Sequence, residues 1–192
     1  GICLLLGVGF LVGQISKKTL IAAGLAFGFS FLFRFQMGVV FVGPILWLLL
    51  VKKQKFKNVF LFGFSILVPI AIGIGLDRWF YGNWVLSSWN YFNIQILQDT
   101  VNGFGTSPWY DYFPLIIEGA WEPIGWIIVG LSILFLVRNP KHIYLWIIVP
   151  FILIHASIPH KELRFLFPLV GLVPLMILES FDWISNRFNR HK

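Results

Sequence analysis

Long apolar runs, separated by short polar segments, dominate this chain. They occupy residues 1–16, 19–33, 37–51, 58–76, 119–137, 143–158 and 165–181. The runs are continuous, whereas a membrane β-barrel would alternate apolar and polar positions. Helices of this length approach the roughly 30 Å needed to cross a bilayer. The pattern therefore predicts an all-α, polytopic transmembrane bundle with about seven membrane segments, some of them short or broken.

Residues 19–33 and 37–51 are separated by a polar break at Arg34 and Gln36. Each arm is about 15 residues, or roughly 22 Å of helix, which is short for a full crossing. We expect two short or broken helices that turn at Arg34 near the outer face. A single long tilted helix is the alternative, and it would leave Arg34 near the middle of the membrane.

The composition supports a membrane protein and narrows its partners. The chain is 58% hydrophobic and only 12% charged, whereas soluble domains average about 25% charged residues. The net charge is +7, but the basic residues lie in short clusters between apolar runs, which indicates membrane orientation and not nucleic-acid binding. The single Cys3 excludes an internal disulfide and a cysteine metal site. No metal and no cofactor is expected.

Basic clusters predict the orientation of the segments in the membrane. With residues 52–57 in the cytoplasm, successive crossings place the polar stretch 77–118 outside, residues 138–142 inside and the basic tail inside. The same crossings place the basic segment "HKELR" outside, against the rule that the other clusters obey. This exception invites a functional explanation.

The stretch "IPHKELRFLFP" has the residue types of an anion site. Pro159 favours the first turn of a helix, so the charges are expected in the first turns of the last membrane helix. There, His160 and Arg164 would share one face, four residues apart, with Lys161 beside them. Helix N-termini, arginine and lysine all bind phosphates, and Glu162 would orient a cation. The alternative is that the cations only reach lipid headgroups.

The outer stretch 77–118 is rich in aromatic residues interleaved with asparagine and aspartate. Aromatic rings stack on sugars, and amide or carboxylate groups bind hydroxyls. The alternative is an interfacial aromatic belt. Glycine and proline in "GFGTSPWYDYF" favour a folded loop over a membrane span.

Several motifs resemble one known family. "HKELRF" resembles the His-Lys-Glu-x-Arg-Phe motif of the Alg9/PIG-B-like mannosyltransferases, glycosyltransferase family 22. "LDRWFYGNWVLSSWNYFNIQ" and "FGTSPWYDYF" are similar to two further segments of that family, and "GLAFGFSFLFRFQMG" resembles its earlier arginine-containing helix. These matches run in the family's order from about residue 24 to 168.

The resemblance implies a GT-C fold and an inverting sugar transfer on the non-cytoplasmic face. The donor would be a polyprenyl-phosphate sugar, typically dolichyl-phosphate mannose, and the acceptor a lipid-linked glycan or glycolipid. The membrane would be a bacterial inner membrane or the endoplasmic reticulum. The family's acidic catalytic motif would lie before Gly1, so we expect an N-terminal part to be missing and the fragment to be inactive alone. Phe104, Tyr110 and Asp111 depart from the family pattern and leave the acceptor open.

The same resemblance assigns expected roles to individual residues. The donor phosphate would be bound by His160, Lys161, Arg164 and Arg34. Glu162 and Gln36 would orient these cations or bind a sugar hydroxyl. The acceptor cleft would be shaped by Asp77, Asn90, Asn93, Trp109 and Tyr110.

Two other functions remain as alternatives. A lipid transporter or flippase needs polar residues in the middle of several helices, but the runs at 58–76, 119–137 and 165–181 have few polar residues, such as Ser65, Ser132 and Ser180. A non-catalytic membrane subunit that binds a glycolipid is the second alternative. An acidic pair in the upstream loop would favour the enzyme over this subunit.

Overall fold

The protein is helical throughout the part that the computed structural model describes, residues 1–98, 100, 103 and 105–189. In chain order the elements are α1 (Ile2–Val12), α2 (Lys17–Phe33), the 3-10 helix η1 (Phe35–Phe41), α3 (Val42–Leu50), α4 (Phe56–Tyr81), α5 (Ser87–Phe92), the π-helical η2 (Asn93–Leu97), α6 (Tyr112–Gly119), α7 (Glu122–Arg138), α8 (Ile143–Ser157), the 3-10 helix η4 (Leu163–Leu172) and α9 (Val173–Asn189). No strand occurs among these residues, which confirms the all-α prediction. Each of the seven apolar runs contains a helix.

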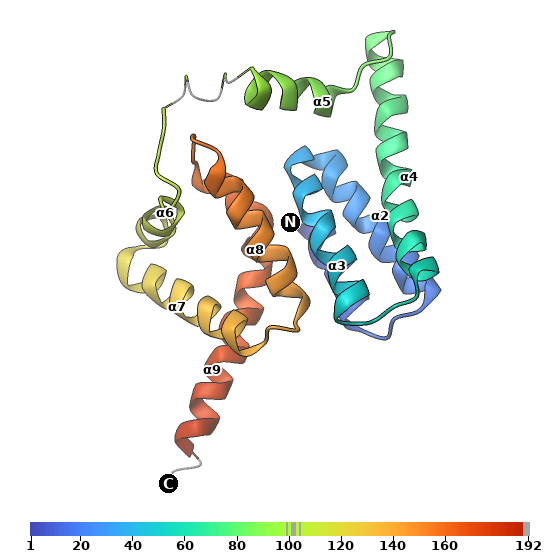
Figure 1. The fold of residues 1–192 in the computed structure, drawn as a ribbon. Coiled ribbons are helices and arrows are strands. Elements are labelled where there is room, and N and C mark those ends of the chain that lie inside the picture. Colours follow the sequence, from blue (N-terminus) through green and yellow to red (C-terminus); the bar gives the residue numbers. More distant parts are fainter. Residues whose placement is uncertain (99, 101–102, 104, 190–192) are drawn as a thin grey trace.

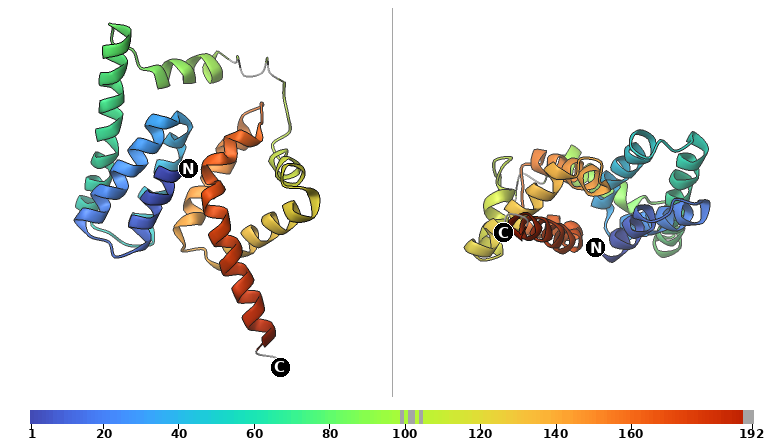
Figure 2. Two further views of the ribbon diagram at one scale, coloured as in Figure 1. Left: turned by 180° about the vertical axis from the view of Figure 1, so that it is seen from behind. Right: turned by 90° about the horizontal axis from the view of Figure 1, so that it is seen from below.

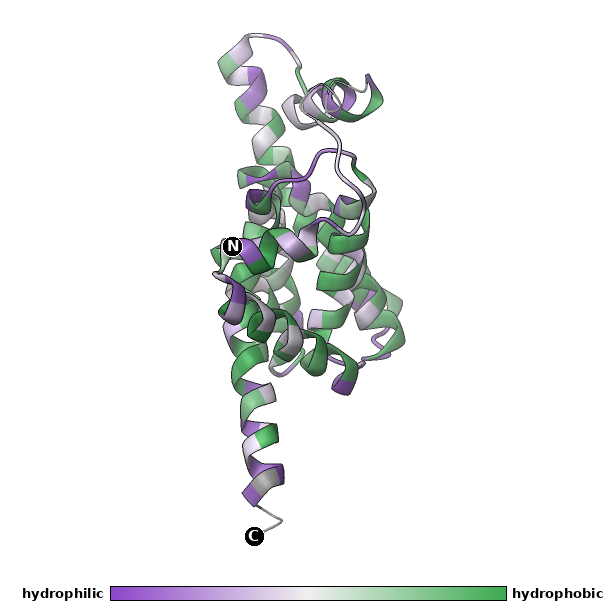
Figure 3. Cartoon of the chain, turned by 90° about the vertical axis from the view of Figure 1, so that its left-hand side faces the viewer, coloured by the Kyte–Doolittle hydropathy of each residue, from purple (hydrophilic) through white to green (hydrophobic). Residues whose placement is uncertain are grey.

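Two helical stretches are long and apolar enough to cross a membrane, Phe56–Tyr81 and Leu163–Arg187. Shorter apolar helices occupy Ile2–Val12, Phe35–Leu50 and Ile143–Ser157. Hydrophobic residues cover most of the helices in the middle of the molecule, and hydrophilic residues are frequent near the C-terminal end of α9 (Figure 3). The count of about seven crossings stays a prediction.

The polar break in the first half forms a turn. α2 starts with a capping box, in which the side chains of Ser16 and Thr19 each accept from the other's backbone N–H. It ends at Arg34, whose backbone is extended (φ −157°, ψ 97°), and the chain then continues into η1 and α3. The expected pair of helices is therefore present, and the single long helix is excluded.

Small residues let α2 lie directly on the backbone of α4. A Cβ added at Gly24 would lie 2.6 Å from the carbonyl oxygen of Phe62, and one at Gly28 would lie 2.4 Å from that of Ile66. Glycines four residues apart permit this close approach in helical membrane proteins. The α2–α4 contact is the most extensive helix pairing in the protein, and it fixes the end of α2 that carries Arg34.

The helices form two groups that meet along α3 and α8 (Figures 1 and 2). The first group is α1 to α4, and the second is α6 to α9. At the junction, Gly43 of α3 approaches the carbonyl of Trp146 in α8, because an added Cβ there would overlap that oxygen. The indole Nε1 of Trp47 also donates to the carbonyl oxygen of Lys141 at 2.8 Å. The two groups are thus joined by backbone-close packing.

The loops sort to opposite ends of the bundle (Figure 1). The basic turns between α1 and α2, α3 and α4, and α7 and α8 lie at one end, which we call the basic end, and α9 extends beyond it. The end of α2, the helix α5 and the turn between α8 and η4 lie at the other end, which we call the α5 end. This arrangement is the one expected from the charge pattern.

Two sequence boundaries differ from the structure. The helix α4 runs on to Tyr81 and ends at Gly82, whose φ of 69° suits glycine, so Asp77 lies on a helix and not in a loop. The outer stretch is also partly helical, because α5, η2 and α6 lie within it.

Candidate functional site: a charged cluster between the two helix groups

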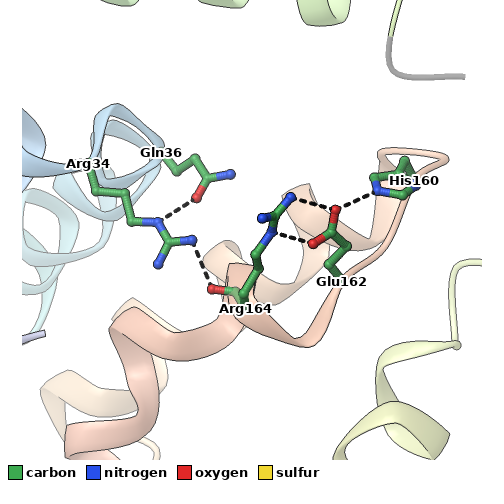
Figure 4. Close-up of polar contacts among 5 residues, drawn as sticks. All are labelled: Arg34, Gln36, His160, Glu162 and Arg164. Carbon is green, nitrogen blue, oxygen red and sulfur yellow. Dashed lines mark hydrogen bonds and ion pairs between the residues drawn. The ribbon is translucent and has the colours of Figure 1, made fainter. Parts of the chain in front are cut away.

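Five polar side chains from the two helix groups meet at the α5 end (Figure 4). We call them the charged cluster: Arg34, Gln36, His160, Glu162 and Arg164. Arg34 donates through Nε to Gln36 Oε1 at 3.0 Å and through Nη2 to the backbone oxygen of Arg164 at 2.9 Å. The second bond links residues 130 positions apart in sequence. The structure therefore brings together three of the residues expected to bind the donor phosphate and the two expected to orient them.

Glu162 is the centre of the second half of the cluster. Its Oε1 is 2.8 Å from His160 Nε2 and accepts from Arg164 Nη2 at 2.8 Å. The Nε of Arg164 pairs with the other carboxylate oxygen, so the guanidinium is held in two-point contact. The expected orienting role of Glu162 thus has a geometric basis.

The local backbone corrects one expectation about this cluster. His160 and Arg164 were expected on one face of a helix, but His160 lies in a bend before the helix, and η4 starts only at Leu163. Glu162 is extended (φ −138°, ψ 142°). The side chains of His160 and Arg164 still converge, because both contact the carboxylate of Glu162. Helical spacing does not bring them together.

The cluster holds more positive than negative charge. The pKa of Arg34 is lowered, first by burial and second by the nearby positive charge of Arg164. The pKa of Glu162 is lowered, first by the hydrogen bond with His160 and then by Arg164. The side chain of Arg164 is 64% exposed, and the cluster holds one carboxylate for its two guanidinium groups. A site with two adjacent arginines and one carboxylate is suited to an additional anion.

Lys161 has a different environment from the rest of the motif. It is buried, with 7% of its surface exposed, and its ammonium donates to the backbone oxygens of Ser107 and Ile158, both at 2.9 Å. Burial lowers its pKa, with Asp111 acting in the opposite direction. The structure therefore directs Lys161 towards the outer segment and not into the charged cluster.

A cavity of about 360 Å³ adjoins the cluster on the side of the first helix group. Arg34 and Asp77 both line it, together with Ser87, Ser88 and Tyr91. The Oδ2 of Asp77 accepts from the backbone N–H of Ser87 at 3.0 Å, which fixes the start of α5 against α4. Arg34 is thus shared between the charged cluster and a partly polar cavity.

The other expected acceptor residues come from three segments of the chain. Asn90 lies on α5 and Asn93 begins η2. Trp109 and Tyr110 form the exposed turn before α6, with their rings edge to face and 5.7 Å apart. Phe104, which departs from the family pattern, lies outside the described residues. The acceptor cleft thus stays an expectation, and Asp77 shares a cavity with Arg34 of the cluster.

An apolar groove of about 490 Å³ lies in the second helix group. It is lined almost entirely by aliphatic and aromatic side chains of α6 to α9 and η4, including Leu163 and Phe167. Leu163 is the neighbour of both Glu162 and Arg164 in sequence. The groove therefore begins beside the charged cluster.

Two features of the site were not anticipated from the residues. One is the cavity lined by Ser87, Ser88 and Tyr91, where Phe35 and Tyr91 have ring centroids 4.4 Å apart. The other is Tyr112, whose pKa is raised to about 12 by burial and by the charge of Glu162. The aromatic residues of the outer stretch indicated this region from the sequence, but they did not show that Tyr112 is buried while Trp109 and Tyr110 are exposed. Within the described residues, no group of three His, Cys, Asp or Glu side chains is arranged to hold a metal.

Comparison of the sequence with known proteins identifies the family of the chain. The chain is 32% identical over 120 residues to the alpha-1,2-mannosyltransferase ALG9 of Saccharomyces cerevisiae, covering 59% of this chain and 20% of the relative. It is 30% identical over 107 residues to GPI alpha-1,2-mannosyltransferase 3 of Bos taurus, covering 54% of this chain and 19% of the relative. It is also 30% identical over 131 residues to GPI mannosyltransferase 3 of Trypanosoma brucei brucei, covering 60% of this chain and 22% of the relative. The chain thus spans about a fifth of the length of these relatives. No solved structure shows a significant match. The sequence profile of the Alg9-like mannosyltransferase family matches residues 2–192, and the chain belongs to this family.

Proposed function

We propose that this chain forms the donor-phosphate half of a membrane mannosyltransferase. The enzyme transfers a sugar from a polyprenyl-phosphate donor to a lipid-linked glycan or glycolipid on the non-cytoplasmic face. The observation that carries the proposal is the meeting of Arg34 and Arg164, held by Gln36 and Glu162, at one end of a largely apolar bundle. The names of the relatives support mannose as the sugar.

The charges suit the chemistry of the leaving group. As the bond between sugar and phosphate breaks, negative charge grows on the polyprenyl phosphate, so cations at its oxygens stabilise the transition state more than the ground state. Arg34 and Arg164 supply these cations, and His160 donates a hydrogen bond to the phosphate or protonates it. Gln36 and Glu162 restrict the guanidinium groups to orientations that suit the phosphate.

The surroundings fit the two ends of such a donor. The apolar groove that begins at Leu163 suits the first isoprenoid units of the lipid. The cavity shared by Arg34 and Asp77 offers hydroxyl, carboxylate and aromatic groups for a sugar. Asn90, Asn93, Trp109 and Tyr110 complete the proposed acceptor cleft. The catalytic base belongs, in this proposal, to a part of the enzyme upstream of Gly1.

The test is the exchange of Arg164 for alanine in the enzyme that includes the upstream part. Loss of a charge-assisted contact in the transition state costs about 2–4 kcal/mol, so kcat/KM for a polyprenyl-phosphate sugar is expected to fall about 30- to 1000-fold. Arg164→Lys keeps the charge but loses the two-point contact, and an intermediate loss is expected.

Arg187→Ala is the matched control, because it removes one arginine from α9 near the other end of the chain. Because Arg187 lies outside the charged cluster, this variant should leave kcat/KM within about twofold of wild type, which corresponds to a change of at most about 0.4 kcal/mol in the activation free energy. Transfer that persists at the wild-type rate in Arg164→Ala would remove the phosphate-site role. Tight binding of a polyprenyl phosphate without any transfer would identify a glycolipid-binding subunit instead.

A further inference from the structure

The backbone of Ser107 is bound at both its N–H and its carbonyl by the turn between α8 and η4. Its N–H donates to the backbone oxygen of Pro159 at 2.8 Å. Its carbonyl oxygen accepts from the ammonium of Lys161 at 2.9 Å. The same ammonium donates to the carbonyl of Ile158, so it connects the outer segment to the turn that leads into Glu162. These contacts join parts of the chain that are more than 50 positions apart.

Burial makes Lys161 an unusual partner in this contact. Lys161 is among the few charged or polar residues that are buried in the described part of the chain. A buried ammonium is costly unless hydrogen bonds replace its water. Here backbone carbonyls do so, and Asp111 adds a nearby opposite charge. An ammonium held in this way has little freedom to turn towards a ligand.

We propose that Lys161 is a positioning residue that clasps the outer segment 105–112 onto the charged cluster, and that it is not itself a ligand of the donor phosphate. The inference rests on the proposed function and refines it, because it separates Lys161 from the other cations of the motif. The clasped segment contains Trp109 and Tyr110, two of the residues proposed to shape the acceptor cleft. Lys161 therefore acts on the acceptor side, through Ser107.

Placement of Tyr112 supports this view of the segment. Tyr112 follows the clasp, begins α6 and is buried in the main hydrophobic core. Burial, and after it the negative charge of Glu162, raises the pKa of Tyr112. The segment between Ser107 and Tyr112 is thus fixed at both ends, and its exposed turn lies between these two anchors.

The first test measures amide hydrogen exchange in the detergent-solubilised wild-type protein. The amide of Ser107 is expected to exchange slowly, because it donates to Pro159 and lies next to the Lys161 contact. In Lys161→Met, which keeps the side-chain length without the charge, we expect exchange at Ser107 to become roughly 10- to 100-fold faster, as loss of hydrogen bonds to a charged group predicts. Lys161→Arg keeps the charge and donors and should stay closer to wild type.

Lys57→Met is the matched control, because Lys57 is an exposed lysine at the start of α4. It should leave the exchange of Ser107 unchanged. If the wild-type Ser107 amide exchanges at the rate of an unprotected peptide, the clasp is absent and the proposal is wrong. This wild-type measurement decides the matter even if Lys161→Met does not fold.

The second test separates the roles of the cations by kinetics in the enzyme with its upstream part. Lys161→Met should raise KM for the acceptor several-fold and leave KM for the polyprenyl-phosphate donor within about twofold of wild type. Arg164→Ala should lower kcat/KM for the donor and leave KM for the acceptor within about twofold of wild type. If Lys161→Met lowers kcat/KM for the donor as much as Arg164→Ala does, and the exchange rate of the Ser107 amide is unchanged, Lys161 is a phosphate ligand and the proposal is wrong. If Arg164→Ala leaves donor kinetics intact, the proposed function fails, but the exchange result still decides the clasp.

Discussion

At the scale of single residues, Glu162 organises the cations of the site. It has contacts with His160 and Arg164 on its two oxygens, whereas Arg34 is held by Gln36 and by a backbone oxygen. Removal of the carboxylate therefore affects Arg164 and leaves Arg34 in place. The half-exposed ion pair adds little to folding stability, so its contribution is to orientation.

Glu162→Gln is expected to reduce binding of a polyprenyl phosphate about tenfold, with little change in thermal stability. Arg164 loses its two-point partner, and this loss of orientation outweighs the gain from removing a negative charge beside the bound phosphate. The measurement is a titration with dolichyl phosphate, followed by the fluorescence of the tryptophans. Gln36→Glu, which adds a carboxylate beside Arg34, is the companion variant and should also weaken binding by offsetting the positive charge. Unchanged affinity in Glu162→Gln would rule out the orienting role.

The lowered pKa of Glu162 predicts how the binding of dolichyl phosphate depends on pH. A carboxyl whose pKa is lowered in the folded protein is stabilising above the unfolded pKa, and this contribution is lost as the pH falls through the lowered value. The pKa of Glu162 is lowered from 4.5. Binding of dolichyl phosphate should thus show no loss from protonation of Glu162 at any pH above about 4.5. A wild-type fall between pH 7 and 5 that is absent in Glu162→Gln would contradict this.

At the scale of elements, the position of Arg34 depends on how α2 packs on α4. Gly24 and Gly28 bring the two backbones together, and α2 then ends at the arginine. The sequence showed the polar break and the turn, because charges interrupt apolar runs. The sequence did not show that the last helix starts only at Leu163. The contacts of Lys161 before it are made to backbone carbonyls, which every residue type has.

Gly28→Leu is expected to push α2 away from α4, because even a Cβ at this position would lie 2.4 Å from the carbonyl oxygen of Ile66. Overpacking of this kind costs about 1–3 kcal/mol or more, and both the unfolding temperature and the affinity for dolichyl phosphate should fall. Gly63→Leu on α4 is the control, since an added Cβ there has no heavy atom within 4 Å. Equal unfolding temperatures for the two variants would show that the close approach does not matter.

At the scale of the whole molecule, the site lies where the two helix groups meet at the α5 end, opposite the basic loops (Figure 1). The apolar runs predicted the helices well, since bilayer thickness constrains their length and composition. The groups' pairing through α3 and α8 was not predictable, because Gly43 and the carbonyl of Trp146 form a contact that hydropathy does not encode.

The opposite placement of the loops predicts which side of a membrane each one faces. In a Cys3→Ser background, Asn83→Cys should react with a membrane-impermeant maleimide in right-side-out vesicles. Lys141→Cys should react only after the vesicles are opened, because basic loops remain in the cytoplasm. Labelling of both positions from the same side would exclude the proposed orientation.

The bond from Arg34 ends on the backbone of residue 164 and not on its side chain. This hydrogen bond of Arg34 does not depend on the side chain at position 164, and Arg164→Ala leaves it intact. This separation makes the two arginines suitable for a double-mutant cycle. Any coupling energy measured between them reports what they share through the bound anion, free of a direct structural dependence of one on the other.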